Sequence, residues 1–547
     1  MNHLFLFTIT PVQDFISQSR KLLDLYGSSS ILSCMSEIGI MICNREKGKT
    51  VFPYYDKKNS SNSYPNRFLV EFKDKNLDEI KKIAKLIEKS LQKFLRGLNS
   101  KNHQKIYEHI ENYFSFYWAI SEIENNDYKN AFDIVEKRLA GAKNTRFFTQ
   151  LGNREGERGR KCSICGERNV TIYQNPLPML KEQIDSDKPK KDKIAQKQEG
   201  LCGVCYIKRR YGKDRARFES TADIALINIF NELDKNDYSL LKKDPQLFFE
   251  ENLTDTYFKK YGYRVKELSK YKEQYQQFQN DIKNSALKQT SYYAVIMFDG
   301  DNMGKWLSGE YIEESKLQDF HTFLSKKLIV FANSVQKMKD DNLVPIYAGG
   351  EDFLGFVNIN YLFEILQLLR DRWNEIVNEP LKEEFNLNRD FTFSAGVVIA
   401  HYKTPLHEVL KRVRSSEKEA KSYFGKDKDA ICLTALKRSG EIVEGVIKYD
   451  NIKTLQKILD ELKENFLDGF ISVLDREFNL IEQNGIRIRR QIKAEIKRLL
   501  KRAKLKDDYS IDKIEKNIEK SFIGSNNNFK NFVNILYFIR FIKREIK

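Results

Sequence analysis

The sequence is poor in the features that stabilise secreted or membrane-embedded proteins. It contains only seven cysteines in 547 residues, too few for a disulfide-stabilised scaffold. No run approaches 18 consecutive apolar residues, so the sequence predicts no membrane-spanning helix. The first residues pass directly into a strand-like stretch, without the apolar core of a signal peptide. We therefore expect a cytoplasmic protein with no membrane contact.

Positive charge predominates. Lysine and arginine number 94 and aspartate and glutamate 77, which gives a net charge of +17. An excess of this size favours contact with a polyanion, and RNA or DNA is the first candidate. A lysine-rich solvated surface would give the same composition, so charge alone does not decide. A hydrophobic content of 41% is enough for several cores, and at roughly 150 residues per domain the length suggests three to four domains.

Five segments differ in pattern and together predict an α+β protein. Their boundaries are 1–150, 151–215, 216–290, 291–450 and 451–547. The first begins strand, helix, strand, strand, with strands expected over 4–10, 50–55 and 67–72, which is the start of a ferredoxin-like unit. The second holds two cysteine pairs, the third is helical and charged, and the fifth is all helix. The fourth has the order βαββαβ followed by a helix, with strands over 292–298, 343–348, 353–357 and 391–400 and helices over 316–338, 361–377 and 406–423.

An acidic turn is the most informative stretch of the fourth segment. Gly349 and Gly350 permit a tight hairpin and close approach of a ligand, and Glu351 and Asp352 follow at its tip. The sequence Asp299-Gly300-Asp301 ends the first strand of the same unit. In a βαββαβ sheet that strand lies beside the hairpin, so three or four carboxylates would converge at one edge. Mg²⁺ or Mn²⁺ would relieve their repulsion, and two such ions suit nucleotidyl transfer. A simple solvated turn is the alternative.

These motifs resemble the large polymerase/cyclase subunits of type III CRISPR complexes, nearest the Cmr-type (III-B) branch. Residues 349–352 resemble the GGDD motif of the family's palm domain, which is related to GGDEF domains, and residues 299–305 resemble the segment after the first palm strand. Residues 393–403 and 417–421 resemble the fourth strand and the following helix, and residues 10–16 and 20–29 the opening of a first palm domain. The resemblance implies two ferredoxin-like palm domains that bind ATP between them.

The resemblance also implies residue roles. Asp299, Glu351 and Asp352 would be catalytic and hold two Mg²⁺ or Mn²⁺ ions. The residues expected to bind the nucleotide are Gly300, Asp301, Gly349, Gly350, Lys421, Gly27 and Ser28. Partners would be other complex subunits, a guide RNA and a target RNA, and target binding would switch on synthesis of cyclic oligoadenylate or a related adenylate conjugate from ATP.

Two features depart from the family pattern. Glu351 stands where the family usually has aspartate, which moves the carboxylate by about 1.5 Å and leaves the product open between a cyclic oligoadenylate and a linear or mixed conjugate. The chain has six histidines and none is followed by aspartate, so we expect no HD nuclease domain.

Two C-x-x-C pairs, Cys162 with Cys165 and Cys202 with Cys205, suit one tetrahedral zinc ion. Two redox pairs are the alternative, but the thioredoxin-like context that they require is absent. Four thiolates leave no open coordination position, so the role would be structural. The other cysteines, Cys34, Cys43 and Cys432, sit among apolar residues and are interpreted as core.

A basic stretch runs from Arg487 to Lys506, with ten lysines or arginines and one acid. On a helix, Ile492, Ile496, Leu499 and Leu500 would form an apolar stripe with basic flanks. The residues expected to contact an RNA backbone are Arg487, Arg489, Arg490, Lys493 and Lys497. A solvated helix face is the alternative. His401 and His407 flank a strand exit near the proposed site and are interpreted as packing or surface residues.

The favoured function is therefore a nucleotidyltransferase. The first alternative is a non-catalytic scaffold subunit of the same RNA-guided complex, which the retained acidic cluster argues against. The second is a free-standing diguanylate cyclase. That enzyme would need neither a second αβ unit, nor a zinc site, nor a basic helical tail.

Overall fold

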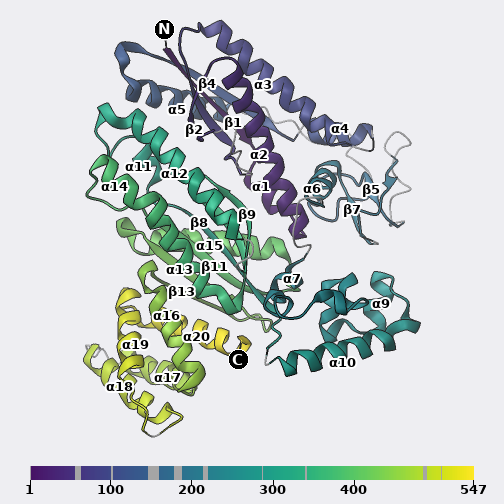
Figure 1. Cartoon of the computed structure of the whole chain (residues 1–547), viewed down its shortest axis with the longest axis vertical. Helices are drawn as coiled ribbons and strands as arrows, with labels where there is room; N and C mark the ends of the chain where they lie inside the picture. The colour runs from purple at the N-terminus through teal and green to yellow at the C-terminus, as the bar shows by residue number, and fades with distance from the viewer. Residues whose placement is uncertain are drawn as a thin grey trace.

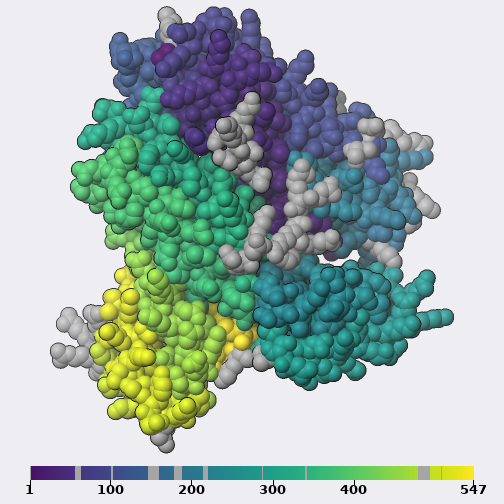
Figure 2. Space-filling model, in the orientation of Figure 1, coloured from purple at the N-terminus to yellow at the C-terminus, as the bar shows by residue number. Residues whose placement is uncertain are grey.

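The computed structural model describes residues 2–55, 63–99, 101, 103–111, 113–145, 159–175, 177, 188–196, 198–213, 220–285, 287–338, 342–483, 489–506 and 508–546. Two αβ units pack together, a cysteine-rich segment and a helical segment lie beside them, and helices end the chain (Figure 1). In the space-filling view the first unit lies above the second, and the C-terminal helices lie beneath it (Figure 2). The expected α+β class with two ferredoxin-like sheets is confirmed.

The first unit contains a four-stranded antiparallel sheet in the order β2-β3-β1-β4. Its strands are β1 (Asn2–Thr10), β2 (Lys49–Phe52), β3 (Arg67–Phe72) and β4 (Ser115–Ile123). Alternate residues of β1 enter different cores: Phe5 and Phe7 pack with α2 (Leu22–Arg45) and α3 (Leu77–Gly97), whereas Leu4 and Leu6 pack with α5 (Tyr128–Asn144). Because both faces are covered, β1 is buried along almost its whole length.

The second unit repeats this strand order and extends it. Its sheet has the order β13-β12-β11-β8-β10-β9, so β11-β8-β10-β9 corresponds to β4-β1-β3-β2 of the first unit. The strands are β8 (Tyr292–Gly300), β9 (Leu343–Gly349), β10 (Asp352–Asn358), β11 (Phe393–His401), β12 (Ala430–Leu436) and β13 (Ile442–Lys448). Helices α12 (Leu317–Lys337) and α13 (Leu362–Trp373) share a core with one face, and α15 (Leu406–Tyr423) with the other. The β12–β13 hairpin was not predicted, because only a helix was expected after β11.

The intervening segments are smaller. The cysteine-rich segment forms a three-stranded sheet, β6-β5-β7, and the next segment is mostly short helices, as expected. Their elements, with the remaining short helices of the two units, are α1 (Gln13–Ser17), α4 (Gln104–Glu111), β5 (Ile172–Tyr173), β6 (Lys190–Lys191), β7 (Gly200–Leu201), α6 (Gly203–Lys213), α7 (Thr221–Ala225), α8 (Ile227–Phe230), α9 (Asp255–Tyr261), α10 (Leu268–Asn284), α11 (Met303–Leu307) and α14 (Glu379–Phe385).

The described part of the C-terminal segment is helical, as predicted. Its helices are α16 (Ile452–Glu464), α17 (Phe470–Gln483), α18 (Arg489–Ala503), α19 (Asp512–Gly524) and α20 (Phe529–Ile546). α20 packs against β13 of the second sheet, where Ile535 lies beside Gly445. The helices therefore continue the core of the second unit.

Helix α2 is long and apolar enough to cross a bilayer by length and composition alone. However, 72% of its most apolar stretch is buried inside the protein, where it packs between the first sheet and α6. Packing in the core accounts for its apolar composition.

The two αβ units meet at a buried histidine. His321 on α12 accepts a hydrogen bond at Nδ1 from the Tyr128 hydroxyl of α5, at 2.9 Å, and donates from Nε2 to the Leu307 carbonyl, also at 2.9 Å. With this tautomer both ring nitrogens of the neutral ring have a hydrogen-bond partner. Burial lowers the pKa of His321 to about 4.

We expect this histidine to make folding stability sensitive to acid. The unfolded chain takes up a proton at His321 near pH 6.5 and the folded chain only near pH 4, so its contribution is complete above pH 6.5 and is lost as the pH falls toward 4. At pH 5 the loss amounts to about 2 kcal/mol. Urea unfolding at pH 7.5 and 5.0 should show a smaller pH effect for His321→Gln than for the wild type, and equal effects would contradict this role.

Candidate active site at the sheet edge

The acidic turn lies at the edge of the second sheet where β8 ends. β10 pairs antiparallel with β8, so the β9–β10 turn lies beside Asp299 and Gly300. Gly350 has a φ of 64°, in the left-handed region that glycine adopts without strain. A Cβ added to Gly300 would lie 3.0 Å from the Cβ of Glu351. The fold thus brings the two acidic sequences together, as their order along the chain predicts.

A lysine and a fourth carboxylate complete this edge. Lys421 on α15 forms one ion pair with Asp299 and another with Glu417, at 3.0 Å. Burial raises the pKa of Glu417 to about 7. Burial and the charge of Lys428 lower the pKa of Lys421 to about 8, and the ion pair with Asp299 favours the charged form of the lysine. No role is predicted for Glu417 from the sequence, although its spacing of four residues from Lys421 places both on one helix face.

Among the described residues, no ion pair balances the charges of the turn carboxylates Glu351 and Asp352 as Lys421 balances that of Asp299. Protein atoms surround the turn, although solvent reaches the Asp352 side chain. Loss of hydration raises the pKa of both Glu351 and Asp352, and the charges of Glu351 and Glu417 raise that of Asp352 further. Repulsion among such groups is relieved by a divalent cation, and a donor set of carboxylate oxygens suits a hard ion. The residues present therefore fit Mg²⁺ or Mn²⁺.

Helix α15 is held close to the sheet by a glycine. A Cβ on Gly396 of β11 would overlap the backbone nitrogen of Glu417, so only glycine lets the helix approach this closely. The close approach brings Glu417 and Lys421 to the edge where β11 begins. Sequence spacing along α15 does not reveal this distance.

The first unit faces the same edge. Arg67 at the start of β3 acts to lower the pKa of Glu351, and it forms an ion pair with Glu136 of α5. The hydroxyl of Ser63 accepts a hydrogen bond from the Ala348 amide, at 3.1 Å. Neither residue was singled out from the sequence, because nothing local connects β3 with a turn almost 300 residues later.

Asp301 has contacts of a different kind from those of Asp299. Its buried carboxylate accepts hydrogen bonds from the hydroxyls of Thr392, at 2.8 Å, and Ser394, at 2.9 Å, and from the amide of Asp429, at 3.1 Å. These contacts join β8, β11 and the start of β12. These contacts favour a role for Asp301 in positioning the strands, over the direct nucleotide contact predicted from the sequence.

Gly27 and Ser28 lie in the contact between α2 and α6. A Cβ on Gly27 would overlap the Lys208 carbonyl of α6, and Ser28 is fully buried with its hydroxyl donated to the Asp24 carbonyl at 2.6 Å. These contacts account for both residues by helix packing, and their predicted nucleotide contact stays a prediction. Small residues are needed here because two helices cross at backbone contact.

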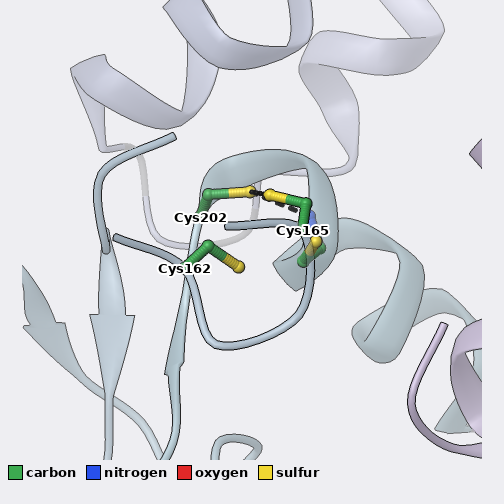
Figure 3. A group of neighbouring side chains, drawn as sticks. Cys162, Cys165 and Cys202 are labelled. Carbon is green, nitrogen blue, oxygen red and sulfur yellow. Dashed lines mark hydrogen bonds between the residues drawn. The ribbon is translucent and has the colours of Figure 1, made fainter. Parts of the chain in front are cut away.

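The four paired cysteines form one cluster. Their sulfur atoms all lie within 4.8 Å of one another, and those of Cys165 and Cys202 are 3.8 Å apart (Figure 3). Tetrahedral coordination with bonds of about 2.3 Å places thiolates about 3.8 Å apart. Backbone amides of Ile164 and Cys205 point at the sulfurs of Cys162 and Cys202. The cluster is close enough to bind one metal ion such as zinc, which two independent redox pairs would not require.

The cluster is tied to the first unit through α6, which begins directly after Cys202. Arg209 of α6 is 1% exposed and forms ion pairs with Asp24 of α2, at 2.6 Å, and Glu199, at 2.7 Å. Lys208 donates to the carbonyls of Phe15 and Gln18. Breaking such a buried charge network is costly because it leaves unpaired charges in the interior. Among the remaining cysteines, Cys43 and Cys432 are buried, and Cys34 is half-buried beside the Tyr211 hydroxyl.

The basic C-terminal stretch is only partly described. Arg487 and the side chains of Arg489, Arg490 and Ile492 lie outside the described residues. Ile496, Leu499 and Leu500 are buried, so that part of the predicted apolar stripe is confirmed. Lys493 and Lys497 are exposed but form ion pairs with Glu519 and Glu515 of α19, at 2.8 and 3.3 Å. An RNA would compete with these acids for both lysines.

His401 and His407 lie at the opposite end of the sheet from the acidic turn. β11 is antiparallel to β8, so its final residue, His401, pairs with Tyr292 at the start of β8. His401 is buried against the rings of Tyr292 and Tyr402, and burial lowers its pKa to about 4. The packing role predicted for it agrees with these contacts, whereas the predicted proximity to the site is wrong.

Two ferredoxin-like units that share a core, with an acidic turn on one of them, define a protein of the double-palm, nucleotidyl cyclase-like class. The family model "Cas10/Cmr2, second palm domain" matches residues 292–432, and "CRISPR-associated protein Cmr2, N-terminal" matches residues 4–100. Parts of both αβ units thus match domain models of the Cas10/Cmr2 family, and these matches support a Cmr-type large subunit of a type III CRISPR complex. The CRISPR system Cmr subunit Cmr2 of Pyrococcus furiosus is 26% identical over 606 residues, which cover 87% of this chain and 67% of that relative.

Solved structures share the fold. The type III-B Cmr-beta complex in its apo state matches with a TM-score of 0.68 and 15% identity over 100% of this chain and 82% of the other. The same complex bound to cognate target RNA matches with a TM-score of 0.65 and 14% identity, over 99% of this chain and 83% of the other. A Csm1–Csm4 cassette in complex with cA4 matches with a TM-score of 0.50 and 14% identity, over 99% of this chain and 70% of the other. At these identities the comparison concerns the fold alone.

Proposed function

We propose that the chain is a target-RNA-activated nucleotidyltransferase that makes an adenylate second messenger from ATP. The observation that carries the proposal is the convergence of Asp299, Glu351 and Asp352 at one sheet edge, with a lysine beside them and the first palm opposite. Similar folds bound to cognate target RNA and to cA4 support it. Guide RNA, target RNA, ATP and the other complex subunits would be the partners.

In this proposal Asp299, Glu351 and Asp352 would hold two Mg²⁺ or Mn²⁺ ions, which would supply charge neutralisation and favour loss of the proton from the attacking hydroxyl. Lys421 exchanges its contact with Asp299 for the triphosphate. Gly300, Gly349 and Gly350 let the nucleotide approach the backbone, and Asp301 keeps β8 and β11 in position. The remaining chemistry is mainly positioning, as is usual for phosphoryl transfer.

The cysteine cluster would hold a structural zinc ion. Its four ligands are all protein thiolates, so a bound zinc has no open position for a substrate. RNA contact by residues 487–497 remains part of the proposal. Lys493 and Lys497 would then exchange acidic partners on α19 for phosphates.

Product analysis tests the proposed reaction. We expect the chain, assembled with its neighbouring subunits and guide RNA, to convert labelled ATP into an adenylate product when Mg²⁺ or Mn²⁺ and matching target RNA are both present. Mass spectrometry of the product decides between cyclic, linear and mixed adenylates. Absence of any product under these conditions would favour the scaffold alternative.

Arg67 provides a test of the contribution from the first palm. Because its charge acts on Glu351 from the opposite unit, we expect Arg67→Gln to lower the rate of ATP turnover roughly 10–100-fold. Arg45→Gln, an exposed change on the same unit, is the matched control. If both variants turn over ATP equally, Arg67 takes no part in the reaction.

A further inference from the structure

One of the hydrogen bonds to Asp301 comes from a residue with an unusual backbone conformation. Asp429 has a φ of 50°, in the left-handed region that few residues other than glycine adopt, although aspartate tolerates it better than most. Its amide donates the 3.1 Å hydrogen bond to Asp301, and its carbonyl accepts one from the Tyr449 amide, also at 3.1 Å. Whatever fixes the conformation of Asp429 therefore also fixes the carboxylate of Asp301.

The buried side chain of Arg370, on α13, holds Asp429 in this conformation. Its Nη2 atom donates to both carboxylate oxygens of Asp429, at 2.6 and 2.7 Å, and Asp450 adds a longer ion pair at 3.7 Å. The guanidinium carbon lies 5.6 Å from the ring centroid of Phe393 and 5.2 Å from that of Tyr449. Aromatic contacts on the guanidinium restrict where it can lie, so Asp429 has a fixed partner.

The loop before Asp429 is held through its backbone. Lys448, the last residue of β13, donates from Nζ to the carbonyls of Asp427 and Lys428, the latter at 2.6 Å. Its ammonium also lies 4.6 Å from the ring centroid of Phe424. The loop is thus fastened by main-chain contacts, and the ion pair with Arg370 is the contact that acts on the Asp429 side chain.

Stability alone does not explain a buried ion pair at this position. The cost of taking two charges out of water can exceed their attraction, and replacing such a pair by apolar groups is often neutral or stabilising. Burial raises the pKa of Asp429 to about 6, although the charge of Arg370 opposes the rise. The pair is better explained by the geometry that it fixes.

This geometry reaches the acidic edge through Asp301. Asp301 directly follows β8, and Asp299, two residues earlier, pairs with Ser394 of β11. The Ser394 hydroxyl donates to Asp301 and accepts a hydrogen bond from the Ala430 amide of β12, at 3.3 Å. Ser394 and Asp429 together hold the end of β8 against the starts of β11 and β12. A shift of Asp301 would therefore move Asp299.

We propose that the Arg370–Asp429 ion pair positions the catalytic edge. It fixes the Asp429 amide on Asp301 and so holds Asp299 where it can share a divalent ion with the turn carboxylates. In this role neither member of the pair contacts the nucleotide or the ion, so both are positioning residues. The inference rests on the metal site of the proposed function. Loss of groups that orient metal ligands weakens metal binding or activity by about 10–100-fold.

Binding of Mn²⁺ to the full chain without nucleotide tests this role, with the free ion measured by electron paramagnetic resonance. The Glu351→Gln/Asp352→Asn variant identifies the ions that bind at the acidic edge. We expect Arg370→Met/Asp429→Asn to weaken this binding about tenfold. The same variant should keep its Tm within about 3 °C of the wild type, because it leaves no unpaired charge in the interior.

Arg412→Met/Glu444→Gln is the matched control, because it removes a half-buried ion pair of 2.8 Å between α15 and β13. It should bind Mn²⁺ as the wild type does. Arg370→Lys keeps the charge but not the planar fork of the guanidinium, so its affinity should fall between those of the wild type and the double variant. Wild-type affinity in both Arg370 variants, or an equal loss in the control, would overturn the positioning role.

Assays of adenylate product separate this inference from the proposed function. Weaker Mn²⁺ binding by the Arg370 variants, with no product from any chain including the wild type, would reject the reaction and retain the positioning role. If the wild type binds no Mn²⁺ that Glu351→Gln/Asp352→Asn removes, the metal assignment and the positioning role are both wrong. A lower Tm with unchanged Mn²⁺ affinity would show that the ion pair is structural only.

Discussion

The Glu351→Ala/Asp352→Ala variant is expected to make at least about 10³-fold less adenylate product than the wild type under target-RNA activation. Both side chains lie at the tip of the β9–β10 hairpin and support no core contact, so the variant should still assemble with its partner subunits. Glu383→Ala, an exposed acid on α14, is the matched control. Undiminished turnover in the double variant would show that the metal assignment is wrong.

The same variant has an effect on stability that does not depend on activity. The folded state raises the pKa of both carboxyl groups, so at neutral pH their charges destabilise it, and this cost is present above the folded pKa values and disappears as they are protonated on acidification. We expect the variant to have a higher Tm than the wild type at pH 7.5. Mg²⁺ should raise the Tm of the wild type but not that of the variant. A variant less stable than the wild type would mean that the turn is structural.

Removing one ligand of the cysteine cluster is expected to have the second large effect. We expect Cys202→Ser to lose one zinc ion per chain and to lower the Tm by roughly 5–10 °C, because metal binding contributes directly to folding free energy. The effect should spread to the first palm, since α6 begins beside Cys202 and carries the buried Arg209 network.

Cys34→Ser is the control for this change, because Cys34 lies outside the cluster. Elemental analysis measures the zinc, and differential scanning calorimetry measures the Tm. If the Cys202→Ser variant retains its zinc, the four thiolates do not act as one site. A chain that loses zinc without a change in Tm would show that the metal has no structural role.

Much of the catalytic edge could be predicted from the sequence because its signals are local. Strand periodicity located β8, β9, β10 and β11, and the glycines before Glu351 marked a tight turn between two of them. Once the order βαββαβ is recognised, the neighbours of the first strand follow, so Asp299 could be placed beside the turn without a structure. The C-x-x-C pairs are likewise local, since each pair supplies two thiolates at a suitable spacing.

Only the tertiary structure could assign the residues whose partners are distant in the chain. Gly27 and Ser28 lie in a helix crossing with α6, which no spacing near residue 27 reveals. His401 lies at the opposite edge because the antiparallel pairing of β11 with β8 reverses its direction. Arg67 and Glu417 reach the acidic turn because two units pack together and Gly396 lets α15 lie close to the sheet. Periodicity and turn chemistry thus determined which elements form, whereas long-range pairing and close backbone packing decided which side chains meet.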